Sequence, residues 1–141
     1  MQDNPLTGMK LVNVSRIPIR WGDMDAMGHV NNTTYFRYLE QARIDWYGNH
    51  GNGKAGVETA VVHCWCSYRR PLFYPGDLEI KTYAGQPGRS SFKIVHEIRR
   101  SDDPDTVYAI GGSTVVWVDT ITGKSAPLPR KMLELMAPDS Q

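Results

Sequence analysis

The feature that most constrains the fold is a single helical segment with apolar side chains on more than one side. Between Asn31 and Tyr47, apolar residues recur at intervals of three and four, which is the spacing of one helix face. This stripe comprises Tyr35, Leu39, Ala42 and Trp46, and further aromatic residues fall on other sides at Phe36, Tyr38 and Tyr47. Because a flat sheet covers only one side of a helix, the pattern favours a sheet that curls around it.

The segments on either side of this helix alternate in the manner of β-strands. A β-branched stretch at 10–20 precedes the helix, and its Pro18 indicates an edge strand or a bulge. Gly48 ends the helix, and four more strands are predicted at 58–70, 78–84, 90–100 and 107–118. The turns between them are short and rich in Gly, Pro and Asp, which is typical of antiparallel neighbours. Gly111 and Gly112 in the last strand predict a bulge or a close backbone approach.

The sequence therefore predicts one domain of the α+β class spanning residues 1–141, with the order strand, long helix, then four strands. Its 141 residues are too few for two ordinary domains. The predicted architecture is a curved five-stranded antiparallel sheet wrapped around one long central helix. Residues 1–8 are expected to be frayed, and residues 129–136 to form a short terminal helix.

Charge and composition exclude several classes of partner. The net charge of +1 gives no basic field for nucleic acid. No apolar run approaches the ~20 residues that span a bilayer, so no membrane association is expected. Cys64 and Cys66 would lie on one face of a strand, roughly 6.6 Å apart, which suits neither a disulfide nor, without a second ligand pair, a metal. Two buried thiols in a reducing compartment are the favoured interpretation, and a cytoplasmic location follows.

The loop before the helix carries the groups best suited to chemistry. A helix beginning at Asn31 or Asn32 would present free backbone N–H groups and the positive end of its dipole. Such an end attracts a carboxylate, a phosphate or the oxyanion of an acyl-transfer reaction. Gly28 would let a ligand approach the backbone, and Asp25 could serve as a nucleophile or general base toward a carbonyl.

The same residues also allow an interpretation without catalysis. Asp23 or Asp25 could simply cap a turn, and Asn31 or Asn32 could be the helix N-cap. His29 could be an ordinary hydrogen-bonded loop residue. Spacing alone leaves both interpretations open.

A resemblance to a known family bears on this choice. The hotdog-fold acyl-CoA thioesterases, in particular the 4-hydroxybenzoyl-CoA thioesterase group, have a signature that this loop resembles. The matching residues are Arg20-Trp21-Gly22-Asp23-Met24-Asp25-Ala26-Met27-Gly28-His29-Val30-Asn31-Asn32, then Tyr35, Glu40 and Arg43. Later pieces follow in the family's order: Arg70-Pro71, Pro75-Gly76-Asp77 and Gly88-Arg89-Ser90-Ser91-Phe92. The likeness covers roughly residues 17–129.

The resemblance implies hydrolysis of an acyl-CoA thioester to the free acid and CoA, without a metal or other cofactor. Asp25 matches the family's essential carboxylate, and the backbone N–H near Asn32 matches the donor that polarises the thioester carbonyl. His29 matches part of an Asp-Asn-His series found in acyl-carrier-protein thioesterases, although Met27 replaces the Asn of that series.

The resemblance also implies how CoA and a second subunit take part. It places CoA contacts at Gly28, Arg89, Ser90 and Ser91, and Arg70 at a strand end is a further candidate for a phosphate. It implies a homodimer with active sites shared at the interface, and in some members a tetramer.

Two alternatives stay open at this point. One is a non-catalytic module that binds an acyl thioester, and the other is a thioesterase for acyl-carrier-protein substrates. The sequence does not specify the acyl group.

Overall fold

The structure is a computed structural model that describes residues 4–47 and 57–137, without the side chains of Tyr47 and Val57. Its elements follow the predicted order. They are β1 (Met9–Ile19), a 3-10 helix (Trp21–Asp23), α1 (Thr34–Tyr47), β2 (Val57–Tyr68), β3 (Gly76–Gly85), β4 (Ser91–Arg100), β5 (Ala109–Asp119) and α2 (Arg130–Met136).

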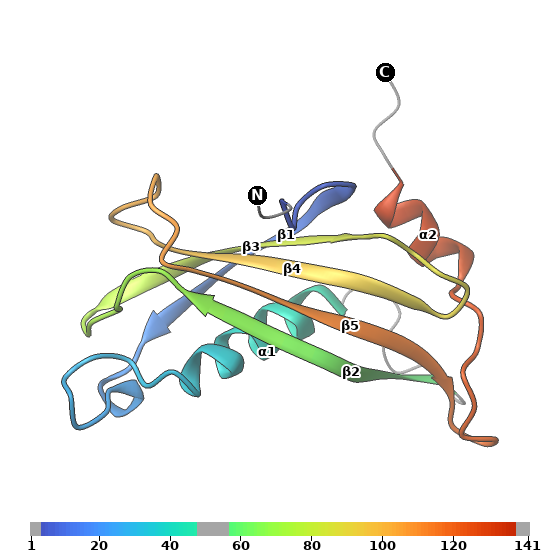
Figure 1. Ribbon diagram of the computed structural model, residues 1–141, viewed down its shortest axis with the longest axis horizontal. Coiled ribbons are helices and arrows are strands. Elements are labelled where there is room, and N and C mark those ends of the chain that lie inside the picture. Colours follow the sequence, from blue (N-terminus) through green and yellow to red (C-terminus); the bar gives the residue numbers. More distant parts are fainter. Residues whose placement is uncertain (1–3, 48–56, 138–141) are drawn as a thin grey trace.

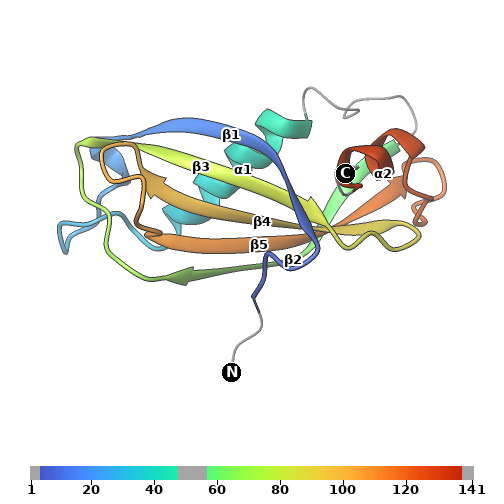
Figure 2. The same cartoon turned by 90° about the horizontal axis from the view of Figure 1, so that it is seen from above.

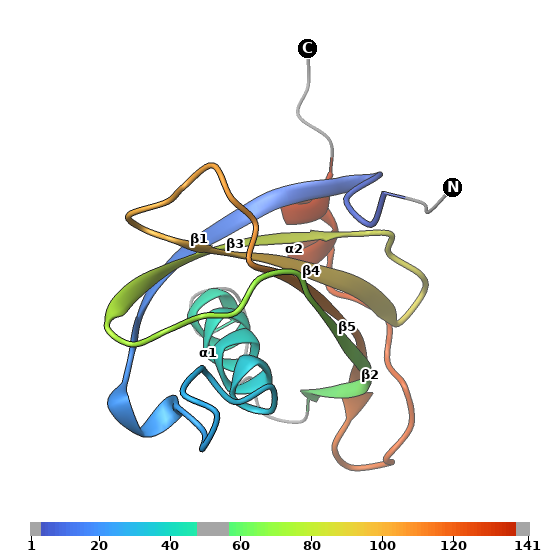
Figure 3. The ribbon, with the colours of Figure 1, turned by 60° about the vertical axis from the view of Figure 1, so that its left-hand side comes forward.

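The five strands form one antiparallel sheet in the order β1-β3-β4-β5-β2. The sheet curves around α1, which lies against its concave face (Figures 1 and 3). The residues of the predicted helical stripe are all buried: Tyr35, Leu39, Ala42 and Trp46. Tyr38 is buried as well, so the helix is covered on more than one side. The predicted hotdog architecture is therefore confirmed.

One prediction about the strand order is wrong. Short connections were expected to join neighbouring strands, yet β2 lies at an edge beside β5, while β3 lies between β1 and β4. The connection at 69–75 crosses the end of the sheet instead (Figure 3). Its seven residues can extend to about 23 Å, whereas three strand spacings need only about 14 Å. Pro71 and Pro75 favour this extended course.

β1 is the other edge of the sheet, as Pro18 indicated. Pro18 pairs with Asp77 of β3, and the ladder between the two strands shifts register between Leu11 and Asn13. Seen from above, β1 lies at one border of the sheet and α1 beneath it (Figure 2). The edge position is thus confirmed, and the bulge in β1 lies at Leu11–Asn13 rather than at Pro18.

Gly111 in β5 marks the place where the helix meets the sheet, and its neighbour Gly112 packs closely against β2. A Cβ atom at Gly111 would lie 2.6 Å from Leu39 Cδ1 and 2.9 Å from the Trp65 carbonyl oxygen. A Cβ atom at Gly112 would lie 2.7 Å from Trp65 Nε1. The expected close approach is confirmed, and it sets the depth at which α1 lies in the sheet.

The core has two parts along α1. One contains Leu39 and Ala42 with Leu72, Leu78 and Ile80, at the end where α1 begins. The other contains Trp46 with Phe92 and Val115, and here Met132 and Met136 of α2 close the far end of the sheet. The terminal helix expected at 129–136 is thus present as α2, which begins at Arg130.

The chain ends and the cysteines complete the description. Residues 4–8 form turns with hydrogen bonds from Thr7 to Asn4 and from Gln86 to Thr7, where fraying of 1–8 was expected. Residues 1–3 lie outside the described residues. Both cysteines are free, but Cys64 is exposed, so the prediction of two buried thiols is wrong for it. Burial raises the pKa of the half-buried Cys66 thiol to about 11. In the described part of the chain, neither helix is long and apolar enough to cross a membrane.

Candidate active site

Asp23 holds the loop before α1 in place. Its Oδ2 accepts hydrogen bonds from the Arg20 backbone N–H, at 2.9 Å, and from the Tyr38 hydroxyl, at 2.7 Å. Tyr38 is buried on α1, and its pKa is raised by burial and by the neighbouring Asp23 carboxylate. The phenol therefore stays protonated and donates to Asp23. The capping interpretation fits Asp23, whose carboxylate ties the loop to the helix.

Asp25 occupies the turn that follows, and only part of its carboxylate is used there. Oδ1 accepts the Met27 N–H at 2.8 Å, and the backbone N–H of Asp25 donates to the His29 carbonyl at 2.9 Å. Oδ2 lies 3.8 Å from His29 Nδ1, and the Asp25 side chain is 23% exposed. The turn thus fixes Oδ1 and leaves Oδ2 without a hydrogen bond from the described residues.

Gly28 has a conformational role in this turn. Its φ of +85° lies in the left-handed region that favours glycine. A Cβ atom there would meet nothing within 4 Å, so the space that the sequence led us to expect is also present.

The helix begins later than predicted, at Thr34 rather than at Asn31 or Asn32. Asn31 causes the delay, because its Oδ1 accepts the Thr33 N–H at 2.9 Å and its carbonyl accepts the Thr34 N–H at 2.9 Å. Asn31 therefore closes a turn ahead of the helix. Within the described residues, the backbone N–H of Asn32 donates no hydrogen bond. The backbone N–H predicted as a donor at Asn32 thus lies in the turn just before the first residue of α1. It is available to bind a ligand.

A cavity of about 280 Å³ brings these groups together. Its lining includes Asp25, His29, Asn32, Tyr35, Tyr68 and Arg70. The Tyr68 hydroxyl donates to the Asn32 carbonyl at 2.9 Å, and the Tyr35 and Tyr68 rings meet edge to face with centroids 4.8 Å apart. The end of β2 is thereby held against the turn that precedes α1.

The two tyrosines are neutral groups in this site. Burial raises the pKa of Tyr35 to about 12, and burial is also the main cause that raises the pKa of Tyr68. Tyr68 was not singled out by the sequence analysis. Its position at the end of a predicted strand, two residues before Arg70-Pro71, was the available signal.

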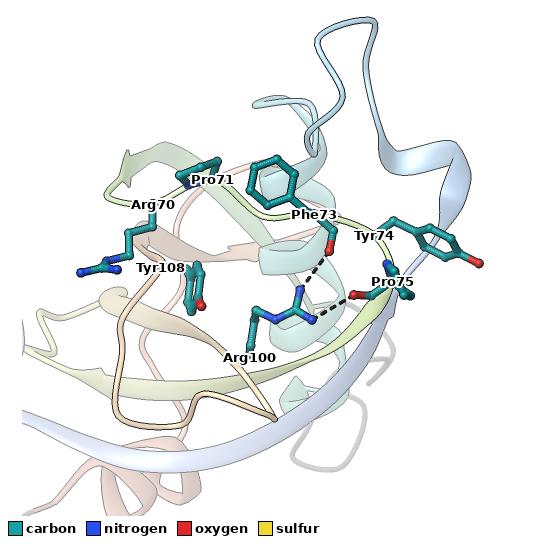
Figure 4. Close-up of a pocket in the computed structure, with 7 residues that line it drawn as sticks. All are labelled: Arg70, Pro71, Phe73, Tyr74, Pro75, Arg100 and Tyr108. Atoms are coloured by element: carbon teal, nitrogen blue, oxygen red, sulfur yellow. Dashed lines mark hydrogen bonds between the residues drawn. The ribbon is translucent and has the colours of Figure 1, made fainter.

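A second cavity, of about 400 Å³, shares Arg70 and Pro71 with the first in its lining (Figure 4). Its aromatic lining includes Phe73, Tyr74 and Tyr108. Arg100 has a structural role here, because its guanidinium donates to the Phe73 and Pro75 carbonyls at 2.9 Å and pairs with Asp102.

Arg70 differs from Arg100 in having a free guanidinium. It forms no ion pair or side-chain hydrogen bond across residues 4–47 and 57–137. In Figure 4 its side chain points away from Arg100. Arg70 is therefore free to hold an anion between the two cavities.

The predicted CoA contacts at the β3–β4 turn lie far from this site within one chain. Arg89 is exposed, and its carbonyl accepts the Leu128 N–H, while the Ser90 carbonyl accepts the Trp117 N–H. Ser91 pairs with Val116 on β5, whereas Tyr68 pairs with Ala109 at the other end of that strand. Seven residues of strand separate the two positions by about 23 Å. A single chain does not bring Arg89, Ser90 and Ser91 to Asp25.

Comparison with known proteins supplies the family. The profile of the thioesterase-like superfamily matches residues 19–136, which covers most of the chain. The chain belongs to the thioesterase-like superfamily. By class it is a thioester hydrolase, and the cavity with Asp25 and Asn32 falls within the matched residues.

Individual relatives agree with this class. A Pseudomonas aeruginosa structure described as a candidate thioesterase is 36% identical, with a TM-score of 0.84, covering 89% of this chain and 98% of its own. A Xanthomonas campestris structure described as a candidate acyl-CoA thioesterase is 38% identical, with a TM-score of 0.71, covering 79% and 96%. An Aquifex aeolicus candidate esterase is 24% identical over 128 residues, which are 87% of this chain and 96% of that protein.

Metal ligation has no obvious place in this thioesterase. Over the residues that the structure describes, no three His, Cys, Asp or Glu side chains are grouped so that they could hold a metal ion. The groups that line the cavity with Asp25 and Asn32 are instead a carboxylate, a backbone N–H, phenols, an imidazole and a guanidinium.

Proposed function

We propose that this thioesterase hydrolyses an acyl-CoA thioester to the free acid and CoA, using Asp25 and the backbone N–H of Asn32. One observation carries the proposal: the partly free Asp25 carboxylate and the undonated Asn32 N–H line the same cavity. A carboxylate and a hydrogen-bond donor on opposite sides of a bound carbonyl are what acyl transfer requires.

The Asn32 N–H would donate a hydrogen bond to the thioester carbonyl oxygen and so polarise the carbonyl. It lies two residues before α1, so the positive end of the helix dipole adds to its field. As negative charge develops on the carbonyl oxygen, this donor stabilises it more than it stabilises the ground state. The hydrogen bond from Tyr68 to the Asn32 carbonyl keeps the residue in place for this task.

Asp25 would then act in one of two ways. As a nucleophile, Oδ2 attacks the carbonyl carbon, the C–S bond breaks, CoA leaves as thiolate, and water hydrolyses the resulting anhydride. As a general base, Asp25 takes a proton from water, the hydroxide adds to the carbonyl, and the same C–S bond breaks. Both routes give the acid and CoA. Thiolate is a good leaving group, so we propose that no cofactor takes part.

His29 is assigned a supporting role. Its Nδ1 is 3.8 Å from Asp25 Oδ2, which is too long for a direct hydrogen bond but suits a water held between them. We propose that His29 orients water or substrate at the carboxylate.

The phosphates of CoA need cations that the net charge does not supply. Arg70 has a free guanidinium between the catalytic cavity and the aromatic cavity of Figure 4, so we propose it as one phosphate ligand. Gly28, with open space above its Cα, leaves room for the pantetheine arm beside the loop.

The remaining CoA contacts are proposed to come from a second copy of the chain. β2 is an edge strand of twelve residues, and Val61 and Val62 on it are 41% and 62% exposed. Such an open edge pairs readily with another strand. If two copies of β2 pair antiparallel, the Val57 end of one meets the Tyr68 end of the other. The second copy would then bring its Arg89, Ser90 and Ser91 to the end of the first copy's sheet where Tyr68 and Asp25 lie. A homodimer with shared sites, or a tetramer of two such pairs, is therefore proposed, and the expected cytoplasmic location stays a prediction.

The test is release of free thiol from a panel of short, long and aromatic acyl-CoA esters. Asp25→Asn should lower turnover by about 10³-fold or more while the unfolding midpoint stays unchanged. Asp105→Asn is the matched control, because Asp105 is exposed on the loop after β4. Unchanged turnover by Asp25→Asn would refute the assignment. Binding of acyl-CoA without thiol release by the native chain would favour the non-catalytic binding module. Thiol release only from acyl-carrier-protein thioesters would favour a thioesterase for those substrates.

A further inference from the structure

A third cavity, of about 180 Å³, lies between α1 and the inner face of the sheet and is not used by the proposed mechanism. On the helix side it is lined by Leu39, Glu40 and Arg43, and on the sheet side by Cys64, His96 and Ser113. Most core cavities are apolar, but four of these six residues are charged or carry a polar group that is deeply buried. The cavity therefore requires an explanation.

His96 contributes a buried nitrogen without a partner. The residue is 1% exposed, and its Nδ1 lies 2.9 Å from the hydroxyl of Thr82 on β3. The other ring nitrogen, Nε2, is buried and has no hydrogen-bond partner among the described residues. Burial and the nearby Arg43 lower the pKa of His96 to about 3, so the imidazole is neutral.

Ser113 contributes a second such group. It is 5% exposed, and its Oγ is also buried without a partner in the described chain. Ser113 pairs with Ile94 and Gly111 pairs with His96, so the two polar side chains are diagonal neighbours on the same face of adjacent strands. Buried polar atoms are nearly always hydrogen-bonded, so two unpaired ones at a single cavity indicate a missing partner.

The cavity lies further along the same elements that form the catalytic cavity. On β2, Tyr68 lines the catalytic cavity and Cys64 lines the third one, which are about 13 Å apart along the strand. Leu39 is about 8 Å along the helix axis from Thr34, the first residue of α1, and Asn32 lies two residues before that helix. Both elements therefore place the polar cavity about 10 Å beyond the proposed site of the thioester carbonyl.

We propose that this cavity receives the far end of the acyl group, and that the acyl group carries a hydroxyl there. The inference rests on the proposed function, which places the carbonyl at Asn32. A hydroxyl both donates and accepts, so it can pair with His96 Nε2 in either tautomer and with Ser113 Oγ. An alkyl end would leave both groups unpaired. A carboxylate is disfavoured, because Glu40 in the lining offsets the attraction of Arg43.

Chain length narrows the substrate further. An extended eight-carbon acyl chain with a terminal hydroxyl spans about 10 Å at C–C bond lengths of about 1.5 Å. The matched probes are therefore 8-hydroxyoctanoyl-CoA and octanoyl-CoA, which differ only in the hydroxyl.

The test measures the ratio of kcat/KM for these two probes. The native protein should prefer 8-hydroxyoctanoyl-CoA by about tenfold, since one well-placed hydrogen bond to a buried group is worth about that factor. Ser113→Ala should reduce the ratio to about threefold or less. Ser101→Ala should keep the native ratio, because Ser101 Oγ is also buried and unpaired but does not line the cavity.

A second variant keeps the test independent of folding. His96→Gln retains a side chain that can donate and accept, and we expect it to keep part of the preference, with melting temperature measured alongside. Equal rates on both probes by the native protein, or an unchanged ratio in Ser113→Ala, would overturn the inference. The latter would mean that water or a second copy of the chain satisfies the two groups. No hydrolysis of either probe, with thiol release from another acyl-CoA of the panel, would also overturn the inference, whereas no release from any acyl-CoA would contradict the proposed function.

Discussion

The Tyr68 hydroxyl donates a hydrogen bond of 2.9 Å to the carbonyl oxygen of Asn32, thirty-six residues earlier in the chain. Tyr68 ends β2, and Asn32 lies in the turn before α1. The bond therefore connects an edge of the sheet to the backbone whose N–H is proposed to polarise the substrate. It is the direct link between the fold and the candidate oxyanion donor.

Removing this hydrogen bond should affect turnover more than stability. Tyr68→Phe keeps the ring contact with Tyr35 but frees the Asn32 turn, so we expect kcat to fall by about tenfold with KM little changed. Tyr68 is 44% exposed, so the free energy of unfolding should fall by no more than about 1 kcal/mol. Steady-state kinetics and urea unfolding check both values. Tyr108→Phe, which removes a hydrogen bond to Asp103 instead, is the control.

Substitutions at Asp23 and Asp25 should have different effects: the first should lower stability and the second should lower activity. Asp23→Ala removes the acceptor of both the Arg20 N–H and the buried Tyr38 hydroxyl, so the free energy of unfolding should fall by about 1–3 kcal/mol. Asp25→Asn should leave stability unchanged and lose activity. Thermal and urea unfolding of the two variants give the comparison. A stable Asp23→Ala protein would show that the loop does not depend on this carboxylate.

The free energy of unfolding should decrease as the pH falls between the unfolded and the folded pKa of His96. Its folded pKa of about 3 lies below the unfolded value of 6.5, so between these values the unfolded chain binds a proton that the folded chain does not. Thr82 on β3 contacts its Nδ1, and Arg43 and Glu40 on α1 and Ser113 on β5 line the same cavity. Of the two charged groups, Arg43 lowers the pKa of His96.

From this difference we expect the contribution of neutral His96 to the free energy of unfolding to be fully present above pH 6.5. Below that pH the free energy of unfolding should fall by up to ~1.4 kcal/mol per pH unit. His96→Gln does not titrate, so its stability should have a shallower slope between pH 6 and pH 4. Urea unfolding at several pH values measures both proteins. Parallel slopes would mean that the carboxylates alone cause the acid sensitivity.

The close packing of α1 on β5 should make Gly111 intolerant of a side chain. A methyl group at this position would meet Leu39 Cδ1 and the Trp65 carbonyl, so Gly111→Ala should lower the free energy of unfolding by about 1–3 kcal/mol. Gly22→Ala has open space around its Cβ and should change stability by no more than about 0.5 kcal/mol. A difference in melting temperature between the two variants would confirm the contact.

The residues that the sequence allowed us to find are those whose roles depend on near neighbours. The spacing of Tyr35, Leu39, Ala42 and Trp46 predicted a helix buried on several sides, and a helix so buried needs a curved sheet. Pro18 predicted an edge, because a proline cannot complete a ladder. The resemblance of the loop to a thioesterase signature directed attention to Asp25 and Asn32, and the structure brings both to one cavity.

By itself, the sequence thus determined the elements, the curvature of the sheet and the loop that carries the chemistry. Only the tertiary structure decided that β2 lies beside β5 at an edge, that Tyr68 reaches Asn32, and that Arg89 lies far from Asp25 within one chain. It also decided that His96 and Ser113 share a polar cavity beside α1. The physical reason is range: periodicity and capping act over a few residues, whereas strand order and burial are set by which distant segments pack together.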